Sequence, residues 1–439
     1  MAQITGSDND NFLFGTSGND QIFGLAGDDI ISGGTGNDLI DGGLGNDSLA
    51  GDDGSDTLKG SSGNDILNGG NGVDKADYSQ LGTSITLLPT GIVAKGGDFG
   101  NDELIQIETI IADASAANNT IDVSTAGVGV SINVSLEVQN LIVDGVPGVS
   151  TFNITNFDDV KGTNANDRIG GDSQNNQLFG NDGNDTILGG AGNDLLDGGL
   201  GNDNLTGDDG SDTLKGSSGN DILNGGNGVD KADYSQLGRS ITLLPTGIVA
   251  KGGDFGNDEL IQIETIIADA SAANNTIDVS TAGVGVSINI GLEVQNLIVD
   301  GVPGVSTFNI TNFDDVKGTN ASDRIAGDSQ NNQLFGNDGN DTILGGAGND
   351  LLDGGLGNDN LTGGSGVDTF VFNSLSEGID TIKDYNFAEA DIIQISKVGF
   401  GATSISDFSY NLSTGTLSFL NTEFAVIENS PSSLNIVLT

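Results

Sequence analysis

Polar and apolar positions along the chain recur with a period of nine residues. Residues 33–68 read GGTGNDLID, GGLGNDSLA, GDDGSDTLK and GSSGNDILN, with glycine at the first and fourth places, aspartate at the sixth and an aliphatic residue at the eighth. Glycines at the first, second and fourth places allow positive φ and close backbone packing, so the first half of each unit should turn tightly. The three residues around the eighth place predict a short strand in which only the middle side chain points inward. The inward side chains of these four units are Ile40, Leu49, Leu58 and Leu67.

One such unit cannot bury its apolar residue alone. Two units per coil, stacked coil on coil, would bury a continuous column of aliphatic side chains. The pattern therefore predicts an all-β fold, a parallel β-solenoid.

Three arrays of eight, eight and six nonapeptides alternate with segments that lack the period. The inserts consist of short aliphatic strand segments separated by Asn, Asp, Gly and Pro, which favours metal-free solenoid coils that bridge the arrays. A small independent β-sandwich with its own ligand is the alternative. The predicted segments are array 1 (1–77), insert 1 (78–161), array 2 (162–233), insert 2 (234–317), array 3 (318–366) and a β-rich C-terminal cap (367–439). An offset of 156 residues aligns Leu49 to Thr206 with Leu205 to Thr362, which indicates duplication of an array and its insert.

The sixth-place aspartates raise an electrostatic problem. Residues eighteen positions apart, such as Asp38 and Asp56, would lie about 4.8 Å apart on successive coils. Calcium relieves this repulsion well, because it takes six to eight oxygen ligands, including main-chain carbonyls, at about 2.3–2.6 Å. The predicted metal ligands are Asp20, Asp29, Asp38, Asp47, Asp56, Asp65, Asp74, Asp167, Asp185, Asp194, Asp203, Asp212, Asp221, Asp230, Asp323, Asp341, Asp350, Asp359 and Asp368.

Asparagine replaces aspartate at the sixth place of three units, at Asn11, Asn176 and Asn332, so sites there should be weak or empty. The first unit also lacks its fourth-place glycine and resembles a cap. Solvated turns without metal are the alternative for the whole set. Turn preference alone does not demand a carboxylate at the sixth place in nineteen of twenty-two units.

Composition supports a chain that needs cations to fold. The 439 residues include 63 acidic and 13 basic side chains, a formal charge of −50, which also disfavours a nucleic-acid partner. No cysteine is present to form disulfides. The first ten residues, MAQITGSDND, do not resemble a cleavable signal peptide, and no apolar run is long enough for a membrane span, so we expect a soluble protein.

The segment Gly33 to Asp41 resembles the RTX (repeats-in-toxin) nonapeptide motif GGxGxDxUx. This resemblance implies a right-handed, calcium-binding parallel β-roll. The C-terminal segment is similar to the region that follows such arrays in serralysin-type proteases. Asp368, Phe370 and Phe372 match its DxFxF motif, and Asp380, Ile382 and Asp384 match a DxIxDF-like turn, although Tyr385 replaces the commoner phenylalanine. The resemblance implies export by a type I secretion apparatus.

Catalysis is not expected. Without histidine or cysteine, the chain cannot form the HExxH zinc site of serralysin-type proteases, a Ser-His-Asp triad or a cysteine nucleophile. A glycosidase-like carboxylate pair remains possible in principle, but the chain has no tryptophan and only four tyrosines to bind sugars. The carboxylates considered are Glu103, Glu108, Glu137, Glu259, Glu264 and Glu293.

The sequence thus predicts a secreted or cell-surface protein whose arrays fold on extracellular calcium. If each site lies between units n and n+2 of one array, the arrays of eight, eight and six units have at most six, six and four sites. About sixteen divalent ions would then cancel 32 of the 50 excess negative charges. The expected role is structural or adhesive, with a cell-surface glycan or S-layer as a possible partner. The alternative is a calcium-dependent carrier for a hydrolase or toxin whose catalytic part is absent here.

Overall fold

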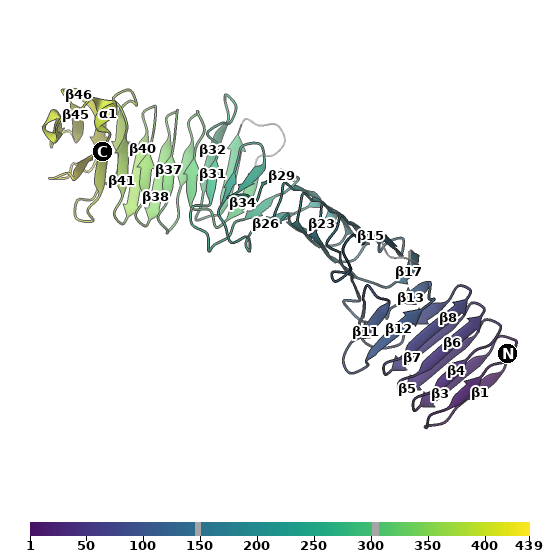
Figure 1. The fold of residues 1–439 in the computed structure, drawn as a ribbon. Helices are drawn as coiled ribbons and strands as arrows, with labels where there is room; N and C mark the ends of the chain where they lie inside the picture. Colours follow the sequence, from purple (N-terminus) through teal and green to yellow (C-terminus); the bar gives the residue numbers. More distant parts are fainter. Residues whose placement is uncertain (145–150, 301–306) are drawn as a thin grey trace. The chain divides into compact units, whose positions relative to one another are not determined.

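The computed structural model describes residues 1–144, 151–300 and 307–439. It divides into two compact units, Met1–Asp230 and Lys231–Thr439, and each is described by itself. Each unit consists almost entirely of short strands stacked in parallel rows (Figure 1). The predicted all-β class with β-roll arrays is confirmed.

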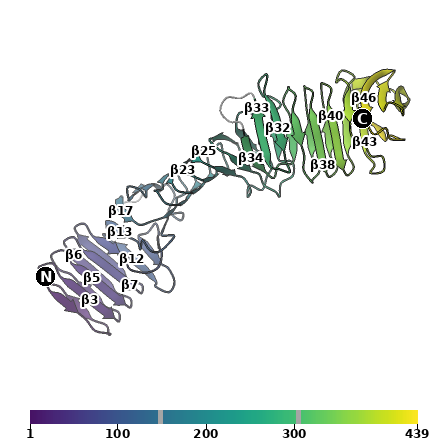
Figure 2. The same cartoon turned by 180° about the vertical axis from the view of Figure 1, so that it is seen from behind.

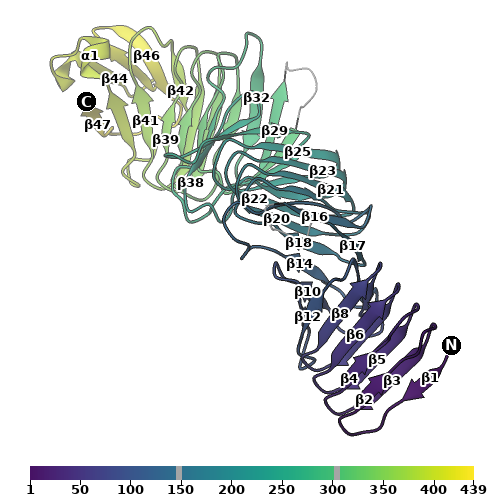
Figure 3. The same cartoon turned by 45° about the vertical axis from the view of Figure 1, so that its right-hand side comes forward.

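The first array forms two parallel sheets, because successive nonapeptides contribute strands to alternate sheets. One sheet contains β1 (Gln3–Thr5), β3 (Gln21–Ala26), β5 (Leu39–Leu44), β7 (Thr57–Ser62) and β9 (Lys75–Asp77), and the other β2 (Phe12–Phe14), β4 (Ile30–Ser32), β6 (Ser48–Asp53) and β8 (Ile66–Asn71). Gln21 pairs with Leu39, and Leu39 pairs with Thr57, a step of eighteen residues. Two nonapeptides therefore make one coil, and the strands lie side by side in Figure 3.

Many array strands are longer than the three residues predicted. β5 continues into the next nonapeptide, where Gly43 pairs with Ser61, so the backbone ladder extends into the turn. Gly43 and Gly45 have φ values of 105° and 130°, as predicted for the second and fourth places. Of the two roles expected for glycine, first-place glycines such as Gly42 do not use positive φ. The close packing described below explains why glycine occupies the first place.

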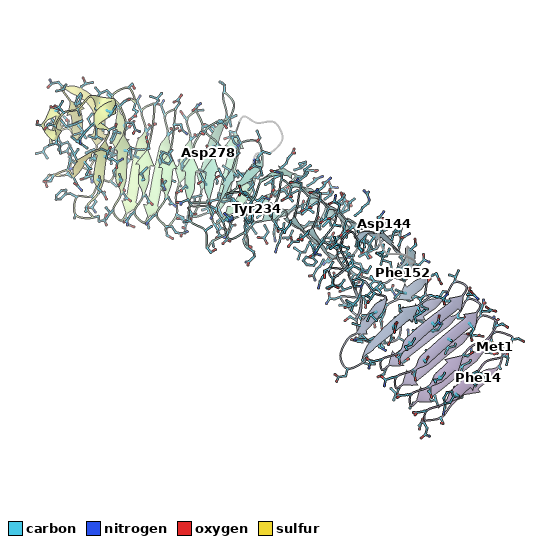
Figure 4. The ribbon with its side chains drawn as sticks, in the orientation of Figure 1. Met1, Phe14, Asp144, Phe152, Tyr234 and Asp278 are labelled. Carbon is cyan, nitrogen blue, oxygen red and sulfur yellow. The ribbon has the colours of Figure 1, made fainter. Side chains whose placement is uncertain are left out.

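The core of the array is a single column of aliphatic side chains. Ile40, Leu49 and Leu58 are at most 1% exposed, as the eighth-place pattern predicts. At the N-terminal end, by contrast, the eighth-place residue Leu13 of β2 is only half-buried, and its outward-facing neighbours Phe12 and Phe14, the latter labelled in Figure 4, are 70% and 68% exposed. The burial of the array core therefore depends on neighbouring coils.

Insert 1 continues the solenoid and adds antiparallel hairpins to it. Its strands are β10 (Ile85–Leu87), β11 (Ile92–Lys95), β12 (Asn101–Ile105), β13 (Thr109–Ile111), β14 (Thr120–Asp122), β15 (Ser131–Ser135), β16 (Asn140–Asp144), β17 (Thr151–Thr155) and β18 (Asp159–Lys161). β12 and β13 pair in parallel with β8 and β9 of array 1. The segments β10–β11–β12 and β15–β16–β17 are antiparallel. This pairing favours solenoid coils over an independent β-sandwich.

Array 2 resumes the parallel stacking on strands of insert 1. Its strands in the first unit are β19 (Arg168–Gly170), β20 (Gln177–Asp182), β21 (Thr186–Ala191), β22 (Leu195–Leu200), β23 (Asn204–Gly210), β24 (Thr213–Lys215) and β25 (Ile222–Gly228). β19 pairs with β15, and β20 pairs with β18. The first strands of array 2 therefore extend sheet edges that insert 1 provides.

The second unit begins with the other copy of the insert. Its strands are β26 (Lys231–Asp233), β27 (Ile241–Leu243), β28 (Ile248–Lys251), β29 (Asn257–Ile261), β30 (Thr265–Ile267), β31 (Thr276–Asp278), β32 (Ser287–Gly291), β33 (Asn296–Asp300), β34 (Thr307–Thr311) and β35 (Asp315–Lys317). It repeats the hairpins of the first copy, with β27–β28–β29 and β32–β33–β34 antiparallel. The sequence duplication is thus a structural one.

Array 3 and the cap complete this unit. Their elements are β36 (Arg324–Ala326), β37 (Gln333–Phe335), β38 (Thr342–Ala347), β39 (Leu351–Asp353), β40 (Asn360–Ser365), β41 (Thr369–Phe372), β42 (Asp380–Ile382), β43 (Ile392–Ile395), α1 (Lys397–Phe400), the 3-10 helix η1 (Ile405–Asp407), β44 (Phe408–Asn411), β45 (Thr416–Phe419), β46 (Thr422–Ile427) and β47 (Ile436–Leu438). β38 and β40 lie side by side (Figure 2). β43 and β46 extend the two rows, and Phe372, Phe400 and Phe424 pack edge to face over their end.

None of the helices in the described part of the chain has the length and apolar character needed to cross a membrane.

Candidate metal-binding ladders

The sixth-place aspartates form ladders of buried carboxylates. All nineteen predicted ligands are buried, with at most 4% of each residue exposed. The sixth and eighth places of a nonapeptide are two residues apart, so in extended backbone their side chains point to the same side. The aspartates therefore lie inside the roll, beside the aliphatic column. Each array has two ladders, since alternate nonapeptides belong to opposite sheets. In array 1, Asp38 and Asp56 belong to one ladder, and Asp29 and Asp47 belong to the other.

One oxygen of each carboxylate is held by the backbone of the preceding coil. The amide of Asp20 donates to Asp38 Oδ1 at 2.7 Å, and the amide of Asp38 donates to Asp56 Oδ1 at 2.7 Å. The same contact recurs in array 2, where the amide of Asp194 donates to Asp212 Oδ1 at 2.8 Å. These hydrogen bonds orient the carboxylates and fix their spacing.

The other oxygen, Oδ2, is buried in most units without a hydrogen-bond partner among the described residues. An isolated buried carboxylate oxygen is costly, so such a repeated row requires a compensating group. The aspartates with this arrangement include Asp29, Asp38, Asp47, Asp56, Asp74, Asp185, Asp194, Asp212, Asp341, Asp350 and Asp368.

First-place glycines leave room beside this oxygen. A Cβ atom at Gly33 would lie 2.5 Å from Asp38 Oδ2 and 2.8 Å from the carbonyl oxygen of Gly51 on the next coil. A Cβ at Gly189 would similarly lie 2.8 Å from the carbonyl oxygen of Gly207 and would collide with Asp194 Oδ2. The missing side chain therefore allows a carboxylate oxygen and a main-chain carbonyl to approach the same small space.

Burial raises the pKa of these carboxyl groups. The pKa reaches about 7 for Asp47 and Asp185 and about 6 for Asp194. Removal from water is the largest cause, and carboxylates on neighbouring coils raise the pKa further, whereas the amide hydrogen bond lowers it. Ionised carboxylates in these ladders therefore destabilise the fold unless a cation binds them.

The donor set fits a hard divalent cation. It consists of carboxylate and carbonyl oxygens, which suit calcium, and contains no nitrogen or sulfur donors. In the part of the chain that the structure describes, no three acidic side chains converge on one point. Any ion would therefore need main-chain carbonyls in addition to Asp Oδ2, and a calcium ion accepts such carbonyls.

Three predicted ligands differ from the others because a threonine already binds the second oxygen. The amide of Thr163 donates to Asp167 Oδ2 at 2.6 Å, and its hydroxyl contacts the same carboxylate at 3.0 Å. Thr16 and Thr319 bind their ladder aspartates in the same way. These threonines occupy the second place of their nonapeptides. Their aspartates fit a metal less well than those with an unpartnered Oδ2.

The asparagine units satisfy their own hydrogen bonds. Asn176 donates its amide group to the carbonyl of Asp158 at 2.7 Å and accepts from the amide of Asp172 at 2.9 Å. Asn332 makes the equivalent contacts. Asn11 bonds to Ser7 at the N-terminal end. The weak or empty sites expected at these units stay a prediction.

Four further acidic residues extend the ladders beyond the arrays and were not predicted as ligands. The amides of Asp65 and Asp74 donate to Asp102 and Glu108 at 3.3 and 2.8 Å. The amides of Asp359 and Asp368 donate to Asp380 and Asp391 at 3.0 and 3.1 Å. Sequence periodicity could not place them, because insertions break the nine-residue spacing. For Asp380, the DxIxDF-like pattern was the one available signal.

Fifth-place side chains form an outer ladder that the sequence analysis also missed. Asn37 Oδ1 accepts from the amide of Ser55 at 3.0 Å, and Asn46 Oδ1 accepts from the amide of Asn64 at 2.9 Å. The recurrence of Asn, Asp or Ser at this place was the available signal.

Comparison with known families identifies the repeats. A family model described as RTX calcium-binding nonapeptide repeat (4 copies) matches all three arrays. The matched residues are 5–40, 41–76, 161–196, 197–232, 317–352 and 335–370. A search of curated proteins found no match. The matched segments contain the carboxylate ladders described above, and the three arrays are therefore RTX calcium-binding nonapeptide repeats.

Proposed function

We propose that this protein is a secreted, non-catalytic scaffold whose arrays fold when they bind extracellular calcium. The observation that carries the proposal is the row of buried Oδ2 atoms, such as those of Asp47 and Asp194, that have no hydrogen-bond partner among the described residues and lie beside first-place glycines. Asp47 and Asp194 are representative, since each is at most 3% exposed. A bound cation would supply the missing partner.

Charge supports coupling between calcium binding and folding. At a formal charge of −50, the metal-free chain repels itself, and its ladder carboxylates must lose water on folding. Binding energy then becomes folding energy. Extracellular calcium modules typically bind at about 0.1–1 mM, far above cytosolic calcium concentrations, so the arrays would remain unfolded before export.

The number of ions should fall below the upper bound of about sixteen. Asp20, Asp167 and Asp323 already have their second oxygen hydrogen-bonded to threonine. Asn176 and Asn332 lack a carboxylate. We therefore expect the strongest binding in the middle of each array.

A structural or adhesive role at the cell surface follows as part of the proposal. The sequence contains no histidine or cysteine, and Glu108, one of the carboxylates considered for catalysis, instead accepts the amide of Asp74. A cell-surface glycan or S-layer would be the partner. Retention of the calcium-loaded protein on such surfaces supports this role, whereas co-purification with an enzymatic subunit supports a carrier role.

Export by a type I apparatus is the second part of the proposal. The cap continues both ladders through Asp380 and Asp391, so its folding would also respond to calcium. Deleting residues 431–439 should abolish export when a type I apparatus is present. Unchanged export would contradict an uncleaved C-terminal signal.

Compaction measured by small-angle scattering tests the proposed function. The radius of gyration should decrease when 5 mM calcium replaces chelator, because the solenoid is far more compact than the unfolded chain. Magnesium at the same concentration should have a weaker effect, since it prefers a tight octahedral shell and retains water. Equal radii in chelator and calcium would contradict calcium-driven folding.

A further inference from the structure

A lysine ammonium is buried at the end of array 1. Lys95 is the last residue of β11, and its side chain is fully inaccessible to solvent. Its Nζ lies 2.9 Å from Asp65 Oδ2, 2.5 Å from Asp102 Oδ1 and 2.9 Å from the carbonyl oxygen of Ser61. Two carboxylates and one main-chain carbonyl thus surround one positive charge.

These partners belong to the carboxylate ladder. Asp65 is the sixth-place residue of its nonapeptide, and its amide donates to Asp102 Oδ1 at 3.3 Å, as array amides donate along the ladder. One coil earlier, Asp47 Oδ2 has no hydrogen-bond partner among the described residues. At Asp65 the equivalent oxygen binds the ammonium. Lys95 therefore contacts the same kinds of oxygen that we assign to calcium elsewhere.

We propose that the step from Asp65 to Asp102 is a cation site that the chain fills with its own Lys95 ammonium. This inference rests on the proposed function, in which calcium occupies the comparable steps within the array. Lys95 supplies one charge covalently, so the step would need no calcium. Insert 1 would then dock on the last coil of array 1 independently of calcium.

The second copy of the insert has the same buried pair. Lys251 Nζ lies 2.5 Å from Asp258 Oδ1, and both side chains are fully buried. The hydroxyl of Tyr234, labelled in Figure 4, donates to Asp258 Oδ2 at 3.0 Å and helps to hold this carboxylate. The ammonium is therefore a feature of the repeated module.

The end of array 3 provides a contrast. There the amide of Asp359 donates to Asp380 Oδ1 at 3.0 Å, as in the other ladder steps. Within residues 307–439, neither carboxylate has a lysine or arginine within ion-pair distance. Array 1, which leads into an insert, thus ends on an ammonium, whereas array 3, which leads into the cap, does not.

Two substitutions of Lys95 separate loss of charge from opening of space. Lys95→Ala removes the ammonium and leaves room for an ion beside Asp65, Asp102 and the Ser61 carbonyl. Lys95→Met removes the charge but keeps the space filled. Native mass spectrometry of the full chain in calcium counts bound ions as integers. We expect one additional calcium in Lys95→Ala and none in Lys95→Met.

Two control variants support the assignment. Asp102→Asn combined with Lys95→Ala should abolish the additional ion, because it removes one carboxylate of the site. Lys59→Ala removes an ammonium that is partly exposed and 3.2 Å from Asp77, and it should leave the count unchanged. Equal calcium counts in Lys95→Ala and the unsubstituted chain would overturn the inference. Absence of calcium from the unsubstituted chain would instead overturn the proposed function.

Hydrogen exchange of the unsubstituted chain provides a test that does not depend on folding of a variant. In chelator, peptides covering residues 66–71 and 92–105 should exchange more slowly than peptides covering residues 30–53. Equal exchange of these segments would contradict calcium-independent docking of the insert.

Discussion

At the first place of each nonapeptide, glycine is required by close packing. Gly33 has no positive φ, yet a Cβ there would lie 2.5 Å from Asp38 Oδ2 and 2.8 Å from the Gly51 carbonyl oxygen. Gly36, at the fourth place, has φ 121° and satisfies the conformational requirement. The same residue type thus serves two different physical purposes within one repeat.

Alanine at Gly33 should therefore impair metal binding as well as stability. The added methyl group would occupy the space beside Asp38 Oδ2, and we expect a loss of about 1–3 kcal/mol in stability and of one bound calcium. Gly18→Ala is the matched control, because a Cβ at Gly18 meets nothing within 4 Å. Calcium counting by native mass spectrometry and calcium-saturated denaturation measure both effects. Identical behaviour of the two variants would contradict the role of the first-place glycine.

Leu25, at the second place of its nonapeptide, stores backbone strain. Leu25 has φ 84°, a conformation that costs an L-residue about 1–2 kcal/mol. Leu25→Gly should therefore stabilise the calcium-loaded array by up to about 1 kcal/mol, after the entropy of the more flexible unfolded chain is subtracted. Leu44 is exposed and has no positive φ, so Leu44→Gly should destabilise. Urea denaturation in calcium compares the stabilities of the two variants. Destabilisation by both substitutions would contradict backbone strain at Leu25.

At the scale of the element, the two oxygens of a ladder carboxylate have separate functions in joining array strands and in binding a cation. Asp194 Oδ1 accepts the amide of Asn176 at 2.7 Å, which joins adjacent coils. Its Oδ2 is buried without a hydrogen-bond partner in the described structure. Oδ1 thus joins adjacent coils, and Oδ2 is the oxygen that a cation would contact.

Asp194→Asn should separate these functions. The amide oxygen can keep the bond to Asn176, while removal of the buried charge relieves the cost reflected in the raised pKa of about 6. We expect about 1–2 kcal/mol more stability in chelator and weaker calcium binding by array 2. Asp194→Ala loses both oxygens and should be less stable than Asp194→Asn in chelator. Equal stability of the two variants in chelator would contradict the role of Oδ1.

The sequence predicted the elements well where the period held. The eighth-place aliphatic column and the stacking of sixth-place aspartates eighteen residues apart follow from a two-unit coil, and Ile40 and Asp38 lie as expected, although the burial of Asp38 was not predicted. The hairpins of the inserts could not be placed, because short aliphatic segments do not reveal their pairing partners. Asp102 and Lys95 were missed for the same reason. They reach the ladder only through the tertiary pairing of β12 with β8.

At the scale of the whole molecule, buried negative charge accumulates coil by coil. Removal from water raises the pKa to about 7 for Asp341 and about 6 for Asp350. In each unit of the structure, ladder carboxylates on adjacent coils raise one another's pKa further. Conditions that neutralise these groups, whether protons or cations, should favour the folded state.

Without calcium, the chain should become more stable as the pH falls from 8 to 5. Folded carboxyl groups with pKa values of about 6–7 take up protons in this range, whereas unfolded aspartates, with pKa near 3.9, do so only at lower pH. Ionisation therefore penalises the folded state above pH 7, and the penalty decreases as these groups become protonated. Circular dichroism in chelator at pH 8, 6.5 and 5 measures this as a rise in the folded fraction of the arrays. Lower stability at pH 5 than at pH 8 would be the opposite of the expected sign.

Calcium binding should show the complementary dependence on pH. Protons and calcium neutralise the same folded carboxyl groups, whereas the unfolded aspartates stay ionised, so the calcium concentration at the folding midpoint should fall as the pH falls from 8 to 6. Circular dichroism during calcium titrations at each pH follows the midpoint. A midpoint that does not change with pH would argue against carboxylates as the ligands.

The most direct test of the central claim is a crystal structure grown in millimolar calcium, with ions located by anomalous scattering. We predict calcium peaks beside the Oδ2 atoms of Asp38, Asp47 and Asp194, and no calcium at the Lys95 ammonium. Ordered water alone between the ladder carboxylates, at saturating calcium, would contradict the claim that cations hold successive coils together.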